Sequence, residues 1–328
     1  MGASAAALAA GAAVATSSPQ SVSSYGPLPR SFSVETVKAV VQKAPQAKKR
    51  LRRNSLSVAS QSGLLETPDP LQLSSSVAYM VDQDTGEVYF EKNAYIQLPI
   101  ASVTKLMTAL VIAQSELPLS QRLKVTRADY VKSTAASKLR SGMVLTREDA
   151  LRAALMSSDN RAAHMLARTY PGGVKVFVQK MNETARELGM HDSRFTDPTG
   201  LSNDNVSTAH DLAILAARVH EYPYLAKAST GAVALINTGV SKVSLMTTNR
   251  LIGDPRWKVG LQKTGYTRAA GRCMVVQSEF AGHRVVMVVL DSENSSRRAN
   301  DMLKMRRWLE DEVRFETQFA NVAPFGLM

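Results

Sequence analysis

Two parts of the chain show the hydrophobic pattern of β-hairpins. In the later part of the first third, the apolar run 77–81 is followed by the turn-forming residues 82–86 and by the strand-like run 88–90. Towards the C-terminus, the β-rich runs 273–280 and 284–290 are separated by three residues that include a glycine. Short β-branched and aromatic runs on either side of a turn pair as antiparallel strands, so both patterns predict hairpins.

Between the hairpins the apolar positions recur at helical spacing. From Ile100, the residues Leu106, Leu110 and Ala113 fall on one face until a Leu-Pro pair at 117–118 ends the pattern. Further helices are predicted over residues 147–156, 160–169, 174–188, 208–220 and 297–312. This order predicts an α+β fold with one antiparallel sheet, helices packed on it and a mostly helical lobe. A functional site is expected in the cleft between sheet and lobe.

The first 75 residues predict a leader and not a folded domain. The Ala-rich run 3–15 resembles the apolar region and cleavage site of an export signal, although the first cation is Arg30. The rest of this segment is rich in Ser, Gln and Pro without sustained periodicity, which is typical of a disordered linker. We therefore expect a folded domain over residues 76–313 and a tail over 314–328.

Positive charge is concentrated in the predicted linker. Of the formal net charge of +12, residues 30–53 carry eight Lys or Arg and one Glu. A basic chain favours anionic partners, but charge alone does not choose among nucleic acid, acidic lipid and wall polymer. No nucleic-acid recognition motif accompanies the cations, so we expect no nucleic-acid partner.

Cysteine and histidine content excludes several chemistries. Cys273 is the single cysteine, so neither an intrachain disulfide nor a cysteine-rich zinc site can form, and we expect it to be a small buried apolar residue. None of the five histidines occurs in a metal-binding spacing. We expect no metal and no cofactor.

Three short motifs occur in order along the chain: Ser102-Val-Thr-Lys105, Ser158-Asp-Asn160 and Lys263-Thr-Gly265. Each alone is weak, and Ser292-Glu-Asn294 repeats the second by chance. The three motifs together are informative because they occur in this order and each lies in a plausible structural setting.

Ser102 and Lys105 lie three residues apart at the start of a predicted helix, so the amine can reach the hydroxyl. An ordinary lysine is protonated at neutral pH, so a basic Lys105 needs its pKa lowered by burial or by a nearby cation such as Lys263. The helix N-terminus would favour a developing alkoxide on Ser102. The structural alternative is a helix-capping Ser102 and a surface Lys105.

Ser158 and Asn160 follow an apolar helix, on a turn of the helical lobe. Ser158 can relay a proton to a leaving amine, and the Asn160 amide can hold a substrate backbone through its donor and its acceptor. The alternative is that Ser158 or Asp159 merely caps the next helix.

The third motif precedes the C-terminal hairpin, where a strand edge can pair with an extended peptide. Gly265 would permit close backbone approach, and the backbone amides of Ser102 and Tyr266 are candidates for stabilising an oxyanion. Alone, Lys263-Thr-Gly265 is more often just a strand end with a turn.

Longer segments around the motifs resemble the low-molecular-mass penicillin-binding proteins of the D-alanyl-D-alanine carboxypeptidase family, peptidase S11. The resemblance covers about residues 75–310 and includes the segments 100–108, 155–163, 197–201 and 262–271. It implies a β-lactamase/transpeptidase-like fold with a five-stranded antiparallel sheet. The segments Ser158-Asp-Asn-Arg-Ala-Ala163 and Tyr170-Pro-Gly-Gly173 are most similar to the endopeptidases of the penicillin-binding protein 7 type.

The resemblance implies that Ser102 attacks a D-alanyl carbonyl, forms an acyl-enzyme and is released by water, and that β-lactams act as covalent inhibitors. The implied roles of the remaining residues are base for Lys105, proton relay for Ser158, substrate ligand for Asn160, electrostatic partner for Lys263 and carboxylate contact for Thr264. The implied substrates are peptidoglycan stem peptides in the periplasm. Family members often add a C-terminal β-domain and an amphipathic helix, but only about fifteen residues follow Val313, so we expect at most peripheral membrane association.

Alternative functions remain at this point. Endopeptidase and carboxypeptidase activities use the same nucleophile and relay, so the sequence does not separate them. A class A β-lactamase normally has a Glu-x-x-Leu-Asn loop, which is missing between Asn160 and Lys263. A non-catalytic wall-binding protein is disfavoured because every motif residue is intact.

Overall fold

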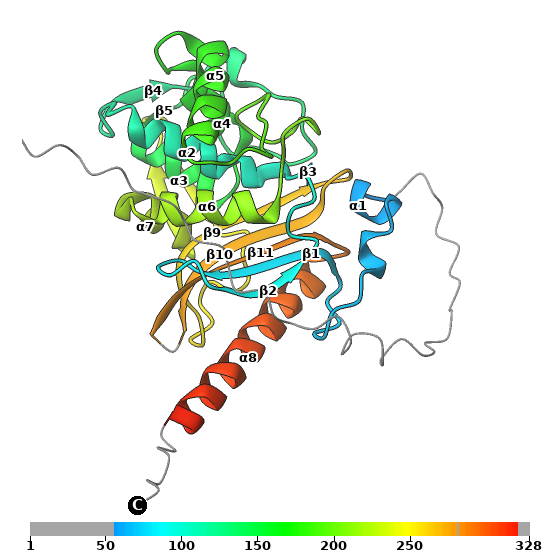
Figure 1. Cartoon of the computed structure of the whole chain (residues 1–328). Coiled ribbons are helices and arrows are strands. Elements are labelled where there is room, and N and C mark those ends of the chain that lie inside the picture. Colours follow the sequence, from blue (N-terminus) through cyan, green and yellow to red (C-terminus); the bar gives the residue numbers. More distant parts are fainter. Residues whose placement is uncertain (1–55, 281, 321–328) are drawn as a thin grey trace, which may run out of the picture. The chain divides into compact units, whose positions relative to one another are not determined.

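A five-stranded antiparallel sheet lies at the centre of the computed structural model, which describes residues 56–280 and 282–320 (Figure 1). The strand order is β2-β1-β11-β10-β9. The strands are β1 (Ser75–Asp82), β2 (Val88–Lys92), β9 (Lys258–Thr267), β10 (Gly271–Phe280) and β11 (His283–Ser292). Both predicted hairpins are present, and pairing of β1 with β11 joins them into one sheet. The expected α+β fold with five strands is confirmed.

Strand β11 is buried on both faces of this sheet. Val286, Val288 and Leu290 belong to the core beneath the helical lobe. The alternate residues Val285, Met287 and Val289 belong to a second core on the opposite face. Successive side chains of a strand point to opposite faces, so a strand between two cores reads as a continuous apolar run.

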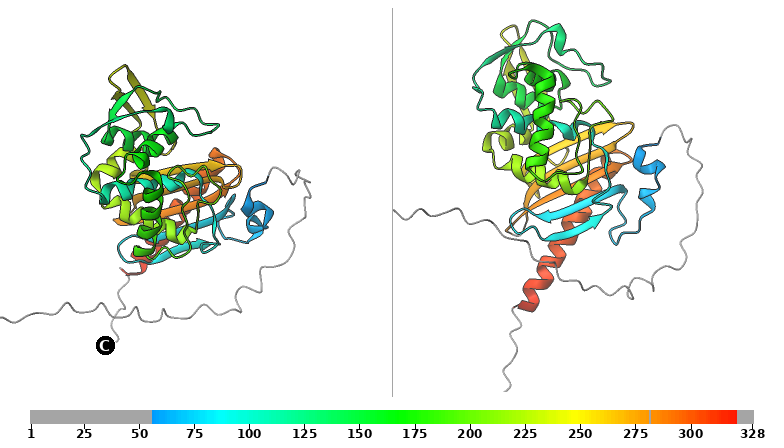
Figure 2. Two further views of the ribbon diagram at one scale, coloured as in Figure 1. Left: turned by 90° about the horizontal axis from the view of Figure 1, so that it is seen from above. Right: turned by 45° about the horizontal axis from the view of Figure 1, so that its top comes forward.

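The second core is covered by the C-terminal helix α8 (Ser295–Ala320), which crosses the face of the sheet opposite the helical lobe (Figure 2). Its residues Met302, Met305 and Leu309 are buried there. The helix continues past residue 313, where the sequence led us to expect a tail.

The helical lobe occupies the other face of the sheet. Its helices are α2 (Lys105–Gln114), α3 (Arg147–Met156), α4 (Asn160–Arg168), α5 (Gly173–Glu187), α6 (Ala209–His220) and α7 (Pro223–Thr230). Short two-stranded ladders complete it: β3 (Leu98–Pro99) with β6 (Val206–Ser207), β4 (Arg122–Lys124) with β5 (Val144–Thr146), and β7 (Val233–Asn237) with β8 (Lys242–Met246).

Helix α2 is the centre of the lobe, because residues 105–112 are all buried. The helix that we predicted from Ile100 starts at Lys105 and is preceded by the 3-10 turn η4 (Ala101–Thr104). The other predicted helices of the lobe agree with the structure within one residue at each end, and α7 was not predicted.

Residues 57–75, which composition suggested to be linker, carry helix α1 (Val58–Gln61) and the 3-10 turn η3 (Leu64–Glu66). The Ser60 hydroxyl donates to the Asp291 carboxylate at 3.1 Å, and Lys92 pairs with Asp69 at 2.8 Å with both side chains buried. Ordered structure therefore begins ahead of the predicted boundary at residue 76.

The signal-like run 3–15 and the basic stretch 30–53 lie outside the described residues. Across the described ranges, no helix combines the length and apolarity needed to cross a membrane.

Candidate active site

The first two motifs meet around the amine of Lys105. This Nζ donates to Ser102 Oγ at 2.9 Å, to Asn160 Oδ1 at 2.7 Å and to the Thr199 carbonyl at 2.6 Å. A neutral amine has two N–H donors and one lone pair. The Asn160 Oδ1 and the Thr199 carbonyl can accept the two N–H hydrogen bonds of a neutral Lys105 amine. The lone pair of the amine then remains to accept from the Ser102 hydroxyl.

Burial makes the neutral form of this amine accessible. The Lys105 side chain has no exposed surface, and its burial lowers its pKa to about 7, against the opposing effect of the negative charges of Asp197 and Asp159. Of the two causes that the sequence left open, the structure supports burial. The cation Lys263 is not needed for the shift, and Lys105 is not a surface lysine.

A second buried lysine pairs with the second serine. Lys263 Nζ donates to Ser158 Oγ at 2.9 Å and to the Thr264 carbonyl at 2.8 Å. Burial, followed by the charges of Lys105 and Arg298, holds the pKa of Lys263 well below its ordinary value. The third motif thus approaches the second from the edge strand β9, and the site contains two Ser–Lys pairs.

On the turn that carries Ser158, it is the neighbouring Asp159 that caps the next helix. Asp159 caps helix α4 by accepting from the Ala162 amide at 3.0 Å. Ser158 has a left-handed backbone with φ of 59°, which is uncommon for a residue with a Cβ and occurs often at functional sites. Because Asp159 alone provides the cap, Ser158 and Asn160 are left for the site.

Both ends of the Asn160 amide are hydrogen-bonded within the protein, which the sequence did not suggest. Its Oδ1 accepts from Lys105, and its Nδ2 donates to the Ser133 hydroxyl at 3.1 Å. We had expected both ends of this amide to meet a substrate. In the structure the oxygen orients the lysine amine, and only the NH2 group can change partner without disturbing Lys105.

Two glycines pack against the turn before Ser102. A Cβ on Gly200 would lie 1.9 Å from the Ala101 carbonyl oxygen, and one on Gly265 would lie 2.9 Å from the Ile100 oxygen and 3.1 Å from the Ser102 nitrogen. Ala101 itself has a φ of 48°. Ser102 therefore follows a strained turn that is held between two backbones, and the close approach predicted for Gly265 is present.

Strand β9 is an outer strand of the sheet, so one of its edges is unpaired within it. On this strand the Thr264 hydroxyl lies 2.6 Å from that of Thr248, and the exposed Tyr266 ring packs under the Arg272 guanidinium at 3.9 Å. The edge thus offers backbone groups, a hydroxyl and an aromatic surface beside Ser102.

Sequence reasoning missed the residue that positions the Thr199 carbonyl. The Asp197 carboxylate accepts from the backbone amides of Thr199, Gly200 and Ser202 at 2.6, 2.8 and 2.9 Å. The turn-forming Asp-Pro-Thr-Gly at 197–200 was a signal for such a loop, whereas nothing in the sequence marked Ser133.

A family model described as D-alanyl-D-alanine carboxypeptidase matches residues 65–294, a range that includes all three motifs. The chain belongs to peptidase family S11. It is a serine hydrolase of the DD-peptidase type, as its resemblance implied.

Two similar S11 relatives are both named D-alanyl-D-alanine endopeptidase. The protein from Pseudomonas aeruginosa is 41% identical over 265 residues, which is 78% of this chain and 85% of the relative. The one from Escherichia coli is 38% identical over 242 residues, which is 73% of this chain and 78% of the relative.

Solved structures agree with the S11 fold. Penicillin-binding protein D2 from Listeria monocytogenes in its cefotaxime-bound form is 29% identical with a TM-score of 0.66, covering 74% of this chain and 99% of that one. A point mutant of the Streptomyces K15 DD-transpeptidase is 28% identical with a TM-score of 0.67, covering 72% of this chain and 97% of that one.

Proposed function

We propose that this DD-peptidase is an endopeptidase that opens D-alanyl–diaminopimelate cross-links in peptidoglycan through an acyl-enzyme on Ser102. The single observation that carries the chemistry is the fully buried Lys105 amine, 2.9 Å from the Ser102 hydroxyl. The preference for cross-links is supported by the two relatives named as endopeptidases.

Acylation begins with transfer of the Ser102 hydroxyl proton to neutral Lys105 while the oxygen attacks the D-alanyl carbonyl. The backbone amides of Ser102 and Tyr266 hold the resulting oxyanion. Ser158, hydrogen-bonded to Lys263, passes its hydroxyl proton to the leaving amine as the C–N bond breaks and takes the proton held by Lys105 in its place, so that Lys105 is neutral again. Water then attacks the ester and gives a proton to Lys105, which passes it to the Ser102 oxygen as the ester C–O bond breaks. This releases the product and restores Ser102.

The substrate lies along the outer edge of β9. The Asn160 NH2 group exchanges its Ser133 partner for a substrate carbonyl, and the Thr264 hydroxyl contacts a substrate carboxylate. A β-lactam occupies the same place and forms a long-lived ester, in keeping with the relative solved in a cefotaxime-bound form. The apolar run 3–15 acts as an export signal, which makes the enzyme periplasmic, with at most peripheral contact with the membrane.

A carboxypeptidase activity is the alternative, because the matching family description and the 32% identical DacF from Bacillus subtilis both carry that name. Purified enzyme should be incubated separately with cross-linked tetrapeptide dimers and with pentapeptide monomers, and the products analysed by mass spectrometry. Conversion of dimers to monomers, lost in Ser102→Ala, supports the endopeptidase. Loss of one alanine from pentapeptides with intact dimers establishes the carboxypeptidase, and no reaction with either favours a non-catalytic wall-binding protein.

A further inference from the structure

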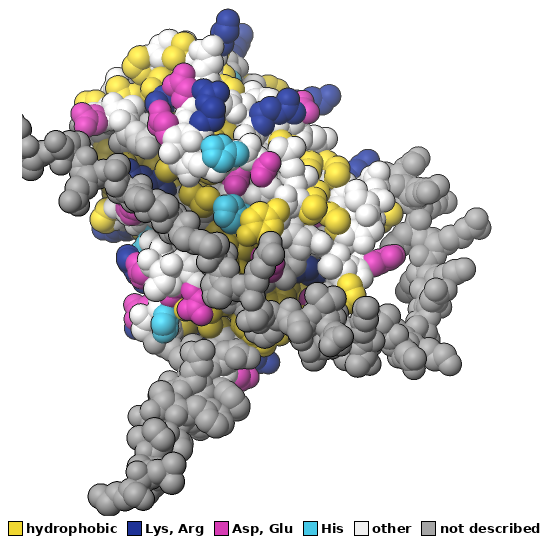
Figure 3. Space-filling view, in the orientation of Figure 1, with side chains coloured by type: hydrophobic (Ala, Val, Ile, Leu, Met, Phe, Trp, Pro, Cys, Tyr) yellow, Lys and Arg dark blue, Asp and Glu magenta, His cyan; other side chains and the backbone are white. Residues whose placement is uncertain are grey.

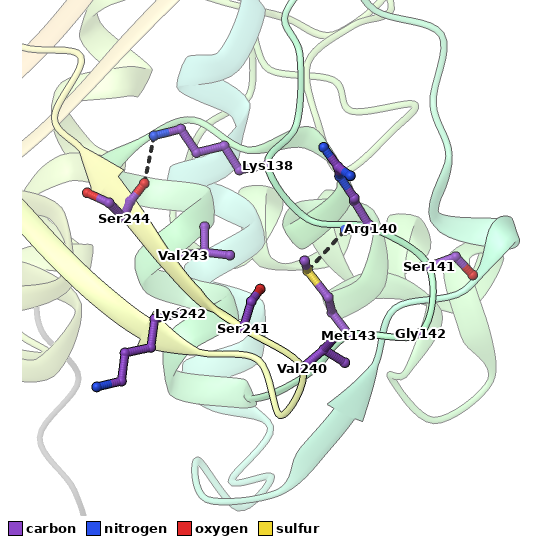
Figure 4. Close-up of a pocket in the computed structure, with 10 residues that line it drawn as sticks. All are labelled: Lys138, Arg140, Ser141, Gly142, Met143, Val240, Ser241, Lys242, Val243 and Ser244. Carbon is purple, nitrogen blue, oxygen red and sulfur yellow. Dashed lines mark hydrogen bonds between the residues drawn. The ribbon is translucent and has the colours of Figure 1, made fainter.

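A pocket of about 570 Å³ lies in the helical lobe, between the loop 130–143 and the β7–β8 hairpin (Figure 4). Lys138, Arg140 and Met143 line it from the loop, and residues 240–244 line it from the hairpin. The Lys138 Nζ donates to the Ser244 carbonyl at 2.7 Å and so connects the two walls. None of these residues takes part in the catalytic hydrogen bonds described above.

The pocket walls carry positive charge without acidic partners. Lys138, Arg140 and Lys242 line the pocket and are exposed, while the surrounding stretches 130–146 and 222–253 contain neither Asp nor Glu. Among the described residues, these three cations form no ion pair within 4.0 Å of a carboxylate. By contrast, the face of the lobe visible in Figure 3 mixes cations with acidic side chains. Unpaired cations in a concave site attract anionic ligands.

Both walls lead from the pocket to the leaving-group end of the active site. On the loop, Ser137 next to Lys138 donates to the Asp159 carboxylate at 2.7 Å, one residue from the proposed proton relay. On the hairpin side, the chain runs from Ser244 to Thr248, whose hydroxyl lies 2.6 Å from that of Thr264. Ser244 and Thr248 are four residues apart and so at most about 14 Å from each other, a distance that a departing stem peptide of a few residues can cover.

We propose that this pocket binds carboxylates of the leaving stem peptide and thereby selects cross-linked substrates. The inference rests on the proposed endopeptidase function. A pentapeptide releases a single D-alanine, which is too short to reach the pocket. A cross-linked dimer releases a second stem peptide, whose diaminopimelate side chain and attached residues extend about 10–14 Å and carry further carboxylates. Lys138 and Arg140 are placed to bind these groups through charge-assisted hydrogen bonds.

The test compares kcat/KM for tetrapeptide dimers with kcat/KM for pentapeptide monomers. In the double variant Lys138→Gln/Arg140→Gln, the ratio of dimer to monomer activity should fall about tenfold, the size expected for losing hydrogen bonds to a charged group. The matched control is Lys175→Gln/Arg186→Gln on α5, which removes the same charge from exposed positions and should leave the ratio unchanged. An unchanged ratio in the pocket variant overturns the proposal.

Binding measurements on the Ser102→Ala background separate the pocket from the activity. Dimers whose further carboxylates, beyond the one that contacts Thr264, are free should bind about tenfold more tightly than dimers in which these further carboxylates are amidated, and the pocket variant should bind both equally. If wild-type enzyme opens no dimers but binding still discriminates, the endopeptidase function fails and the pocket stands. If dimers are opened and binding does not discriminate, the pocket proposal fails and the function stands.

Discussion

The Lys263 amine lies 2.9 Å from the Ser158 hydroxyl, the same distance that separates the Lys105 amine from the Ser102 hydroxyl. Both lysines are fully buried, and the charge of Lys105 lowers the pKa of Lys263. The two pairs are therefore electrostatically linked. In the proposed mechanism, a proton gained by Lys105 during attack makes the Lys263–Ser158 pair a better proton donor for the leaving amine.

Loss of the relay should slow acylation without removing the nucleophile. Ser158→Ala should lower the rate of dimer cleavage by about 10²–10⁴-fold, the usual contribution of general acid–base catalysis. Lys263→Met and the double variant should have similar rates, because the two groups act as a unit. Steady-state kinetics on the three variants measures this coupling, and additive losses would show that Ser158 and Lys263 act independently.

The pH profile of acylation should follow Lys105. Burial lowers its pKa to about 7, and only the neutral amine accepts a proton, so the rate of acylation by penicillin should rise as the pH passes upward through about 7. The Asp197 charge opposes this shift. Asp197→Asn should therefore move the rise to lower pH, whereas Asp204→Asn, on the exposed part of the same loop, should not. A profile unaffected by Asp197→Asn would contradict the assignment of Lys105 as base.

An alanine at position 200 should destabilise the protein by more than the left-handed backbone conformation of Gly200 alone would explain. Gly200 and Gly189 have left-handed φ angles of 80° and 77°, but only a Cβ at Gly200 meets another backbone. Gly189→Ala should cost about 1–2 kcal/mol of unfolding free energy, and Gly200→Ala about 3 kcal/mol or more. Gly200→Ala should also slow acylation, because it pushes on Ala101. Denaturant unfolding with penicillin labelling measures both effects, and equal costs would argue against the packing.

Local patterns in the sequence were sufficient for most elements and for the motif residues. Short β-rich runs on either side of turn residues predicted both hairpins, and apolar periodicity predicted α3 over 147–156 as observed. The partners of Asn160 and the loop held by Asp197 depend on contacts between segments far apart in sequence, which periodicity does not encode. The segment 57–75 was misjudged for the same reason, since its polar residues bond to Asp291 and Lys92.

Residues 57–75 should stabilise the domain. A chain that starts at residue 76 lacks Asp69 and leaves Lys92 buried without its carboxylate, which costs about 3–5 kcal/mol for a broken buried ion pair. It should therefore melt well below a chain that starts at residue 56, and Asp69→Asn in the longer chain should reproduce most of the loss. Equal melting temperatures for the two chains, measured by calorimetry, would show that residues 57–75 do not stabilise the domain and behave as a linker.

The most direct test of Ser102 as nucleophile is the mass of the intact enzyme after brief incubation with penicillin, followed by peptide mapping. The mass should rise by one penicillin molecule, the modified peptide should contain Ser102, and Ser102→Ala should gain nothing. An adduct on another residue, or an adduct that persists in Ser102→Ala, would contradict the mechanism.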